Sequence, residues 1–305
     1  MADFEVRGFR LDDSTKRERL EAVCVSFLTG YNAVIEDDVV DLTDTLAEVE
    51  PHRHGWVYEG AGMACAMLDI LTFSRGRRLA ALMAGSGDLY LHLIHVGVGW
   101  ALAQLRLPGW GGLRGLHPLY RWLALDGGGF WRGFFHSDKH LATDRAGRPV
   151  HGMAAQVWDQ GIGRSLWFVE CADIPSITAR ITGFHESRRA DLWAGVGLGA
   201  CYAGGADDAD LASIAENSGA HRADLAQGAV FAAVARVRSG VIPSYTEQAV
   251  RVLAGVEPAA AAEWEPAARQ TVLDDPTGNG GTIAGYQRVR ALIRQWYLDH
   301  SQEQV

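Results

Sequence analysis

A glycine-centred pattern recurs six times along this chain of 305 residues. The segments are YEGAGMACAML, HVGVGWALAQL, LDGGGFWRGFF, DQGIGRSLWFV, WAGVGLGACYA and AQGAVFAAVAR. Their lead glycines are Gly60, Gly97, Gly127, Gly161, Gly195 and Gly228. A period in the low thirties is typical of one helical hairpin per unit. We therefore predict an all-α fold, with about six helical-hairpin repeats of roughly 34 residues that form an α-solenoid or a closed α/α ring.

The spacing of apolar residues is helical almost throughout, and strand-like alternation is nearly absent. A glycine inside a helix costs about 1 kcal/mol relative to alanine, so its recurrence needs a reason. Close approach of neighbouring helices is one. A dinucleotide-binding motif would instead need a strand before each GxG, and the sequence predicts none. We interpret these glycines as packing residues.

The repeats divide the chain into N-terminal helices (1–54), a helical-repeat core (55–257) and a C-terminal loop with a closing helix (258–305), which we expect to form one structural unit. With 48% apolar residues the chain can bury a sizeable core. A net charge of −9 argues against nucleic-acid binding. We find no targeting signal or membrane-spanning run, and interpret the four scattered cysteines as reduced. These features predict a cytoplasmic protein.

Polar residues precede the lead glycines within mostly apolar helices. They are Glu59, His95, Asp126, Asp159, Gln160 and Gln227. In a stacked array these positions lie at one level, so their side chains are expected to converge on one groove or cavity. A buried carboxyl without a partner has a raised pKa and can act as a proton donor. The alternative is that each acid pairs with an arginine, such as Arg164 or Arg189, and only stabilises the interior.

Asp126 is the sharpest candidate acid. At helical spacing Trp122 and Phe130 share its face, and aromatic faces stabilise cations. Three consecutive glycines, Gly127 to Gly129, would cost roughly 3 kcal/mol in an unbroken helix. We therefore predict a break or bulge that aims Asp126 into the cavity; a turn that Asp126 caps is the alternative.

A short acidic motif near the N-terminus could bind metal. Asp37, Asp38 and Asp41 form a DDxxD pattern, which on a helix could hold Mg²⁺ bridged to a diphosphate, as in ionisation-type isoprenoid synthases. No second metal motif accompanies it, and a solvated helix start explains the acids equally well. We predict no cofactor apart from Mg²⁺, and that only if the substrate is a diphosphate. The pairs His92/His95 in HLIH and His136/His140 in HSDKH have the spacing of metal ligands on a helix, but no further Cys/His motif supports a zinc site.

Four segments resemble a known bacterial family: LYRWLALDGGGFWRGFF, WDQGIGRSLWFVECADI, RRADLWAGVGLGACYAGG and DLAQGAVFAAVAR. It is a domain family of unassigned function that is often encoded beside enediyne polyketide synthases and in other actinobacterial secondary-metabolite clusters. The resemblance runs from about Phe27 to Gly255. The family pattern includes Glu59, Asp126, Gly129, Asp159, Gln160, Gly161, Arg164, Trp167, Arg189, Asp191, Trp193, Gln227 and Gly228. The resemblance implies a role in secondary metabolism and assigns no chemistry.

These observations lead to two hypotheses. In the first, the protein is a terpene-cyclase-like enzyme that cyclises a long apolar isoprenoid or linear polyene through acid-initiated or carbocation chemistry. Its acids would be Asp126, Asp159 and Glu59. Its substrate-binding residues would be Trp122, Phe130, Gln160, Arg164, Trp167, Arg189, Trp193 and Gln227, with the two arginines holding an anionic head group.

In the second hypothesis the protein is a non-catalytic helical-repeat scaffold or carrier for an enediyne-type polyketide assembly. It would act with a synthase partner or as a homodimer. A cyclase should enclose an apolar cavity of several hundred Å³, whereas a scaffold should present an open groove.

Overall fold

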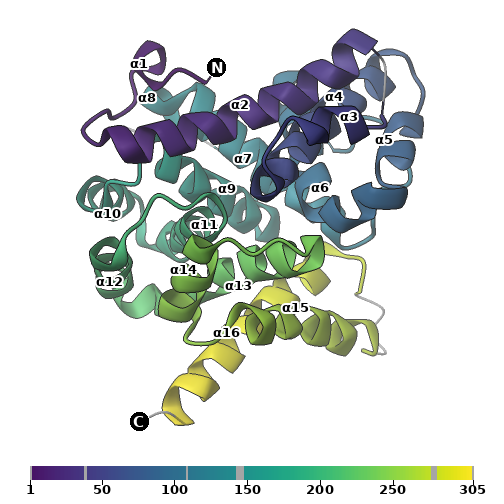
Figure 1. Cartoon of the computed structure of the whole chain (residues 1–305). Coiled ribbons are helices and arrows are strands. Elements are labelled where there is room, and N and C mark those ends of the chain that lie inside the picture. The colour runs from purple at the N-terminus through teal and green to yellow at the C-terminus, as the bar shows by residue number, and fades with distance from the viewer. Residues whose placement is uncertain (1, 38–39, 108, 142–147, 276–279, 304–305) are drawn as a thin grey trace.

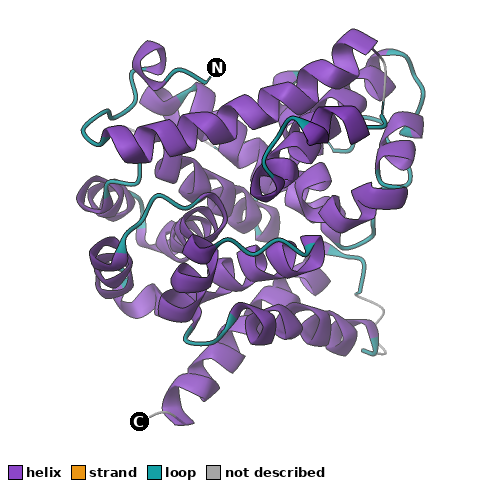
Figure 2. Cartoon of the chain, in the orientation of Figure 1, coloured by secondary structure: helices purple, strands orange, loops and turns teal. Residues whose placement is uncertain are grey.

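The computed structural model describes residues 2–37, 40–107, 109–141, 148–275 and 280–303, and these residues form helices and turns without a strand (Figure 2). The α-helices are α1 (Phe4–Arg7), α2 (Ser14–Asp37), α3 (Thr43–Ala47), α4 (His54–Leu71), α5 (Arg77–Leu82), α6 (Leu91–Gln104), α7 (Leu123–Phe135), α8 (Ser137–His140), α9 (Met153–Val169), α10 (Ile174–Gly183), α11 (Glu186–Ala203), α12 (Asp208–Asn217), α13 (Arg222–Ser239), α14 (Ser244–Ala254), α15 (Pro258–Leu273) and α16 (Ile283–Glu303). Short 3₁₀ turns are η1 (Pro51–Arg53), η2 (Gly85–Tyr90), η3 (Tyr120–Trp122) and η4 (Gly219–His221). The all-α prediction is confirmed.

Aspartates mark three of the helix starts. Asp13 precedes α2 and accepts hydrogen bonds from two backbone N–H groups of its first turn. Asp173 caps α10 by accepting from the N–H of Ser176. Asp207 forms a reciprocal capping box with Asp210 at α12. Because such caps satisfy orphan N–H groups locally, the residues around them predict these boundaries.

The long helices pack in the order in which they occur along the chain. Helix α2 packs on α4, α4 on α6, α6 on α7, α7 on α9, α9 on α11, and α11 on α13. Helix α13 then packs on α14, α15 and α16. Figure 1 shows α2 crossing one end of the molecule, with α15 and α16 at the opposite end. None of the described helices is long and apolar enough to cross a membrane. All four cysteines are buried without a disulfide.

The lead glycines lie where neighbouring long helices approach most closely. A Cβ at Gly97 would overlap the carbonyl oxygen of Glu59, one at Gly161 that of Asp126, and one at Gly195 that of Gln160. A Cβ at any of the other three lead glycines would also overlap a backbone carbonyl oxygen of a neighbouring helix: Gly60, Gly127 and Gly228. These contacts confirm the interpretation as packing glycines. They also place the residues just before each glycine at the centre of the helix–helix contacts.

The predicted break in the Asp126 segment is wrong. Helix α7 runs unbroken through Gly127, Gly128 and Gly129, so neither a bulge nor a turn forms there. Each of the three glycines faces a close neighbour: Gly127 the Val96 carbonyl, Gly128 the Trp158 ring and Gly129 the Trp158 carbonyl. Packing against α6 on one side and α9 on the other therefore offsets the low helix propensity of the triplet.

Candidate functional site

A chain of buried polar side chains crosses the interior, with Arg164 at its centre. Its Nη2 and Nε lie 2.7 and 3.0 Å from Oδ1 of Asp126, and its Nη1 lies 3.7 Å from Oε1 of Glu59. Gln160 donates to the other oxygen of Asp126 at 3.0 Å. Glu59, Asp126 and Gln160 are fully buried. Three of the six polar positions singled out in the sequence, Glu59, Asp126 and Gln160, meet around Arg164, and the ion pair with Arg164 is the one that the stabilising alternative predicted.

The same chain continues toward the C-terminal helix. Gln227 donates to Gln160 at 3.5 Å and accepts from Nε of Arg290 at 2.8 Å. Arg290 also pairs with Asp191, Nη2 to Oδ1, at 2.9 Å. Arg290 was not a candidate in the sequence analysis, although its position within the apolar face of the predicted helix YQRVRALIRQW was a usable signal. Helix α16 is therefore tied into the polar interior.

The carboxyl groups of this network outnumber its arginines. Glu59, Asp126 and Asp191 face Arg164 and Arg290, and a buried carboxylate without compensation is unfavourable. Glu59 has the weaker contacts: the Trp100 indole donates to its Oε1 at 3.0 Å, and its Oε2 has no hydrogen-bond partner among the described residues. Burial raises the pKa of Glu59 to about 7. Glu59 is thus the acid of this cluster that holds a proton near neutral pH.

Asp159 belongs to a separate ion-paired group. Arg188 Nη2 lies 2.6 Å from its Oδ1, and Arg148 Nη1 lies 2.5 Å from its Oδ2. Burial raises the pKa of Asp159 in spite of these cations. Arg189, which the sequence suggested as a partner, instead donates to the backbone carbonyls of Phe184 and Thr182. Arg189 therefore lies outside both acid clusters.

The predicted aromatic residues are divided between different parts of the molecule. The Phe130 ring lies under the Arg164 guanidinium, 4.4 Å from ring centroid to Cζ. Trp167 is fully buried and donates to the Gly204 carbonyl at 2.9 Å, and Trp193 is buried in the core. Trp122 points elsewhere and donates to the Gly281 carbonyl at 3.2 Å. Phe130 is therefore the one of these four that contacts the central cation.

The candidate metal motif is only partly described. The side chain of Asp37 and the whole of Asp38 lie outside the described residues, while Asp41 is exposed and accepts hydrogen bonds from Thr43. His95 is occupied by the backbone, through Leu91 O at 2.7 Å and His117 N at 3.0 Å. Within the described parts of the chain, no three His, Cys, Asp or Glu side chains are grouped to hold a metal ion.

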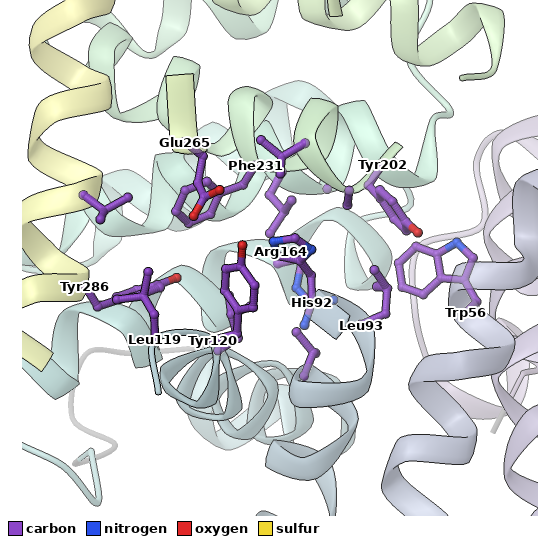
Figure 3. A pocket seen from close by; sticks show the side chains of 17 residues that line it. Trp56, His92, Leu93, Leu119, Tyr120, Arg164, Tyr202, Phe231, Glu265 and Tyr286 are labelled. Atoms are coloured by element: carbon purple, nitrogen blue, oxygen red, sulfur yellow. The ribbon is translucent and has the colours of Figure 1, made fainter. Parts of the chain in front are cut away.

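A small cavity of about 50 Å³ lies between the long helices (Figure 3). Its walls include Trp56, Tyr120, Arg164, Tyr202, Glu265 and Tyr286. Glu265 Oε2 and the Tyr286 hydroxyl are buried there without a hydrogen-bond partner among the described residues, and burial raises the pKa of Glu265. The sequence analysis did not select Glu265. The volume suits a few water molecules and lies well below the 300 Å³ or more of typical ligand pockets.

A larger hollow of about 470 Å³ lies along α6, α7 and α9, and we call it the tryptophan groove. Its lining includes Leu102, Trp110, Trp122, Leu125, Val150 and Trp158. The Trp110 and Trp122 rings meet edge to face, with centroids 5.3 Å apart. None of the described residues that line it is an aspartate or glutamate. Its volume and lining are those of a small-molecule site.

Comparison with known families gives one match. A family model described as "Protein of unknown function (DUF1702)" matches residues 1–297, nearly the whole chain. The chain belongs to the DUF1702 family. Searches of curated proteins and of solved structures find no match. Family membership therefore assigns no chemistry to this DUF1702 protein, and its function must be argued from the geometry.

The raised pKa of Glu59 in this DUF1702 protein predicts a pH effect on stability. The folded chain holds a proton that the unfolded chain, with an ordinary pKa of 4.5, releases. The stabilisation is therefore complete below about pH 4.5 and is lost as the pH rises through about 7. Glu59→Gln retains an acceptor for Trp100 but does not titrate. Between pH 5 and 8, the free energy of unfolding of the wild type should therefore decrease by about 2 kcal/mol more than that of the variant.

Urea unfolding at several pH values measures this difference. The exposed Glu263→Gln serves as a matched control and should reproduce the wild-type dependence on pH. Parallel curves for Glu59→Gln and the wild type would show that Glu59 does not bind this proton.

Proposed function

We propose that this DUF1702 protein binds a long apolar small molecule, an isoprenoid or a linear polyene, in the tryptophan groove. The observation that carries the proposal is the contrast in volume: about 470 Å³ in the groove against about 50 Å³ in the central cavity. Such a ligand suits the secondary-metabolism role that the sequence resemblance implies. The groove is therefore the binding site in this proposal. The acids around Arg164, Glu59 and Asp126, belong to the framework that supports it.

The lining of the groove explains how it would bind such a chain. Each methylene that leaves water contributes about 0.8 kcal/mol, so a ligand of fifteen carbons needs few hydrogen bonds. Trp110, Trp122 and Trp158 supply broad rigid surfaces that lose little side-chain entropy on binding. Gly99 and Gly128 also line the groove, where they let α7 and the Trp158 ring pack closely beside it. These features select for length and apolarity.

The groove favours the carrier hypothesis over the cyclase hypothesis. The described lining residues include no acid, and Asp126 and Asp159 are held by arginines in the interior. Acid-initiated cyclisation stays a second candidate because two other acids fit a proton donor: Glu59, whose pKa is raised to about 7, and Glu265 at the central cavity. That chemistry would require the long helices to separate around the central cavity.

Filling the groove tests the proposal. Ala154 lines it, so we expect Ala154→Trp to weaken binding of farnesol, measured by equilibrium dialysis, at least tenfold while the protein stays folded. Ala267→Trp, on the exposed face of α15, is the control and should bind as the wild type does. Equal affinity in Ala154→Trp would exclude the groove as the site.

An incubation of the wild-type protein with candidate substrates distinguishes a carrier from an enzyme. Incubation with farnesyl diphosphate and geranylgeranyl diphosphate, with and without Mg²⁺, is followed by product analysis. Recovery of the unchanged ligand supports a carrier. A cyclised hydrocarbon or alcohol supports the cyclase hypothesis, and its dependence on Mg²⁺ would show whether Asp37, Asp38 and Asp41 take part.

A further inference from the structure

A basic pocket adjoins the tryptophan groove. It has a volume of about 370 Å³ and is lined by Arg106, Trp131, Arg132, His136, Lys139 and His140. Arg106 and Arg132 line the groove as well, so the two hollows lie side by side and share a wall. Neither arginine was a candidate in the sequence analysis: Arg106 lies just after α6, and Arg132 follows the glycine triplet of α7, where Asp126 was the residue considered. The site as a whole is apolar along the groove and cationic at one end.

The cations of the basic pocket lack carboxylate partners in the described parts of the chain, although Arg132 lies over the Trp131 ring. Arg106, Arg132 and Lys139 form no ion pair with any described residue, and the buried Nε of Arg132 has no hydrogen-bond partner there. The field of these cations reaches the histidines: burial, together with Arg132 and Lys139, lowers the pKa of His140 to about 4. Unpaired cations in one hollow are unusual in a chain of net charge −9, and such a cluster favours an anion.

The backbone at Arg106 adds a second observation. Arg106 has a φ of 55°, in the left-handed region that glycine usually occupies at the end of a helix. It closes α6, with its N–H bonded to the Ala103 carbonyl and that of Leu107 to the Leu102 carbonyl. A side chain in this conformation costs roughly 1 kcal/mol relative to glycine. Phe73 and Cys171 end α4 and α9 in the same way, so this conformation ends the helix and places Arg106 on the wall shared by both hollows.

We infer that the basic pocket binds the phosphate or diphosphate head group of the ligand whose apolar chain occupies the tryptophan groove. The inference rests on the proposed function and adds the substrate class to it. Guanidinium groups suit phosphate oxygens because they present paired N–H donors in a fixed plane. The arginines first considered for this role are not available, since Arg164 is held by Asp126 and Arg189 by backbone carbonyls. Arg106 and Arg132 take their place.

The head group could belong to a free prenyl diphosphate or to an acyl chain on phosphopantetheine. Both combine an apolar chain with a phosphate, which phosphopantetheine carries at the far end of a polar arm, and the apolar groove beside the basic pocket suits that shared chemistry. Farnesyl diphosphate and lauroyl phosphopantetheine are therefore two arms of one experiment, with farnesol as the ligand that has the chain but no anion. Tighter binding of one phosphorylated ligand identifies the source.

The test compares these ligands on the wild type and on the double variant Arg106→Gln/Arg132→Gln. The wild type should bind a phosphorylated ligand at least tenfold more tightly than farnesol in low salt, and 0.5 M NaCl should reduce that advantage. The double variant should lose the advantage, so that its affinities for farnesol and for the phosphorylated ligands become similar. The exposed Arg77→Gln is the matched control and should change neither affinity.

The outcomes separate the two proposals. If the double variant binds both phosphorylated ligands as tightly as the wild type does, the basic pocket is not the head-group site, whatever farnesol does. If farnesol fails to bind while inorganic diphosphate binds and is lost in the double variant, the basic pocket stands and the groove proposal fails. Thermal melts of each variant, recorded by circular dichroism, establish that loss of binding is not loss of fold.

Discussion

Gly161→Ala is expected to destabilise the protein by about 3 kcal/mol, although alanine is the better helix former by about 1 kcal/mol. The added Cβ would overlap the Asp126 carbonyl oxygen and lie 2.8 Å from the backbone nitrogen of Phe130. Helix α7 cannot withdraw freely, because Gly127 holds it equally close to the Val96 carbonyl of α6. A shift of α7 would also move Asp126 away from Arg164. Urea unfolding at pH 7.5 measures the loss.

Gly183→Ala provides the matched control for this prediction. Gly183 is also helical, in α10, but nothing lies within 4 Å of the position of its Cβ. Alanine should therefore be neutral there or stabilise by up to about 1 kcal/mol. If both substitutions changed stability alike, close helix approach would not be the reason for the recurring glycines.

Arg164→Met is expected to lower the free energy of unfolding by about 3–5 kcal/mol. The substitution leaves the fully buried Asp126 with the Gln160 amide and removes the cation nearest to Glu59. An uncompensated buried carboxylate is among the more destabilising changes that a core can suffer. Arg238→Met is the control: Arg238 pairs with Asp88 at 2.7 Å, but the Asp88 side chain is 60% exposed, so the loss should stay below about 1 kcal/mol.

A double-mutant cycle separates the lost ion pair from lost packing. Asp126→Asn alone should destabilise, since it leaves the buried Arg164 guanidinium without its closest anion. In the Arg164→Met background the same change should cost less by about 1–3 kcal/mol, because no cation then remains for Asp126 to pair with. Strictly additive losses would show that the two residues act independently.

These expectations affect how activity assays should be designed. Asp126 and Arg164 are part of the buried framework, so loss of activity in their variants would not by itself identify a catalytic group. Arg106, Arg132 and Lys139 of the basic pocket are better targets, because Arg106 and Lys139 are exposed and Arg132 is only partly buried. Substitutions of these three residues should have little effect on the core.

The local pattern of residues was sufficient to predict the helical class and the packing glycines, and aspartate caps show that several helix starts are also set locally. Each of these depends on neighbours along the chain: Asp173 caps the residues that follow it, and the glycine period records one contact per long helix. The convergence of Glu59, Asp126 and Gln160 could also be predicted, because each directly precedes a glycine at which neighbouring long helices pack closely. Such inferences need only the period of the helix and the order of the repeats.

The pairing of the buried charges and the volumes of the hollows depended on the tertiary structure. Whether Asp126 pairs with Arg164, or Asp191 with Arg290, is determined by the directions of side chains from helices far apart in the sequence. The continuity of α7 through Gly127 and its neighbours depended on contacts with α6 and α9, which outweigh local propensity. The size of the central cavity and of the tryptophan groove depends on how closely backbones approach, and that distance is a property of packed helices rather than of any one segment.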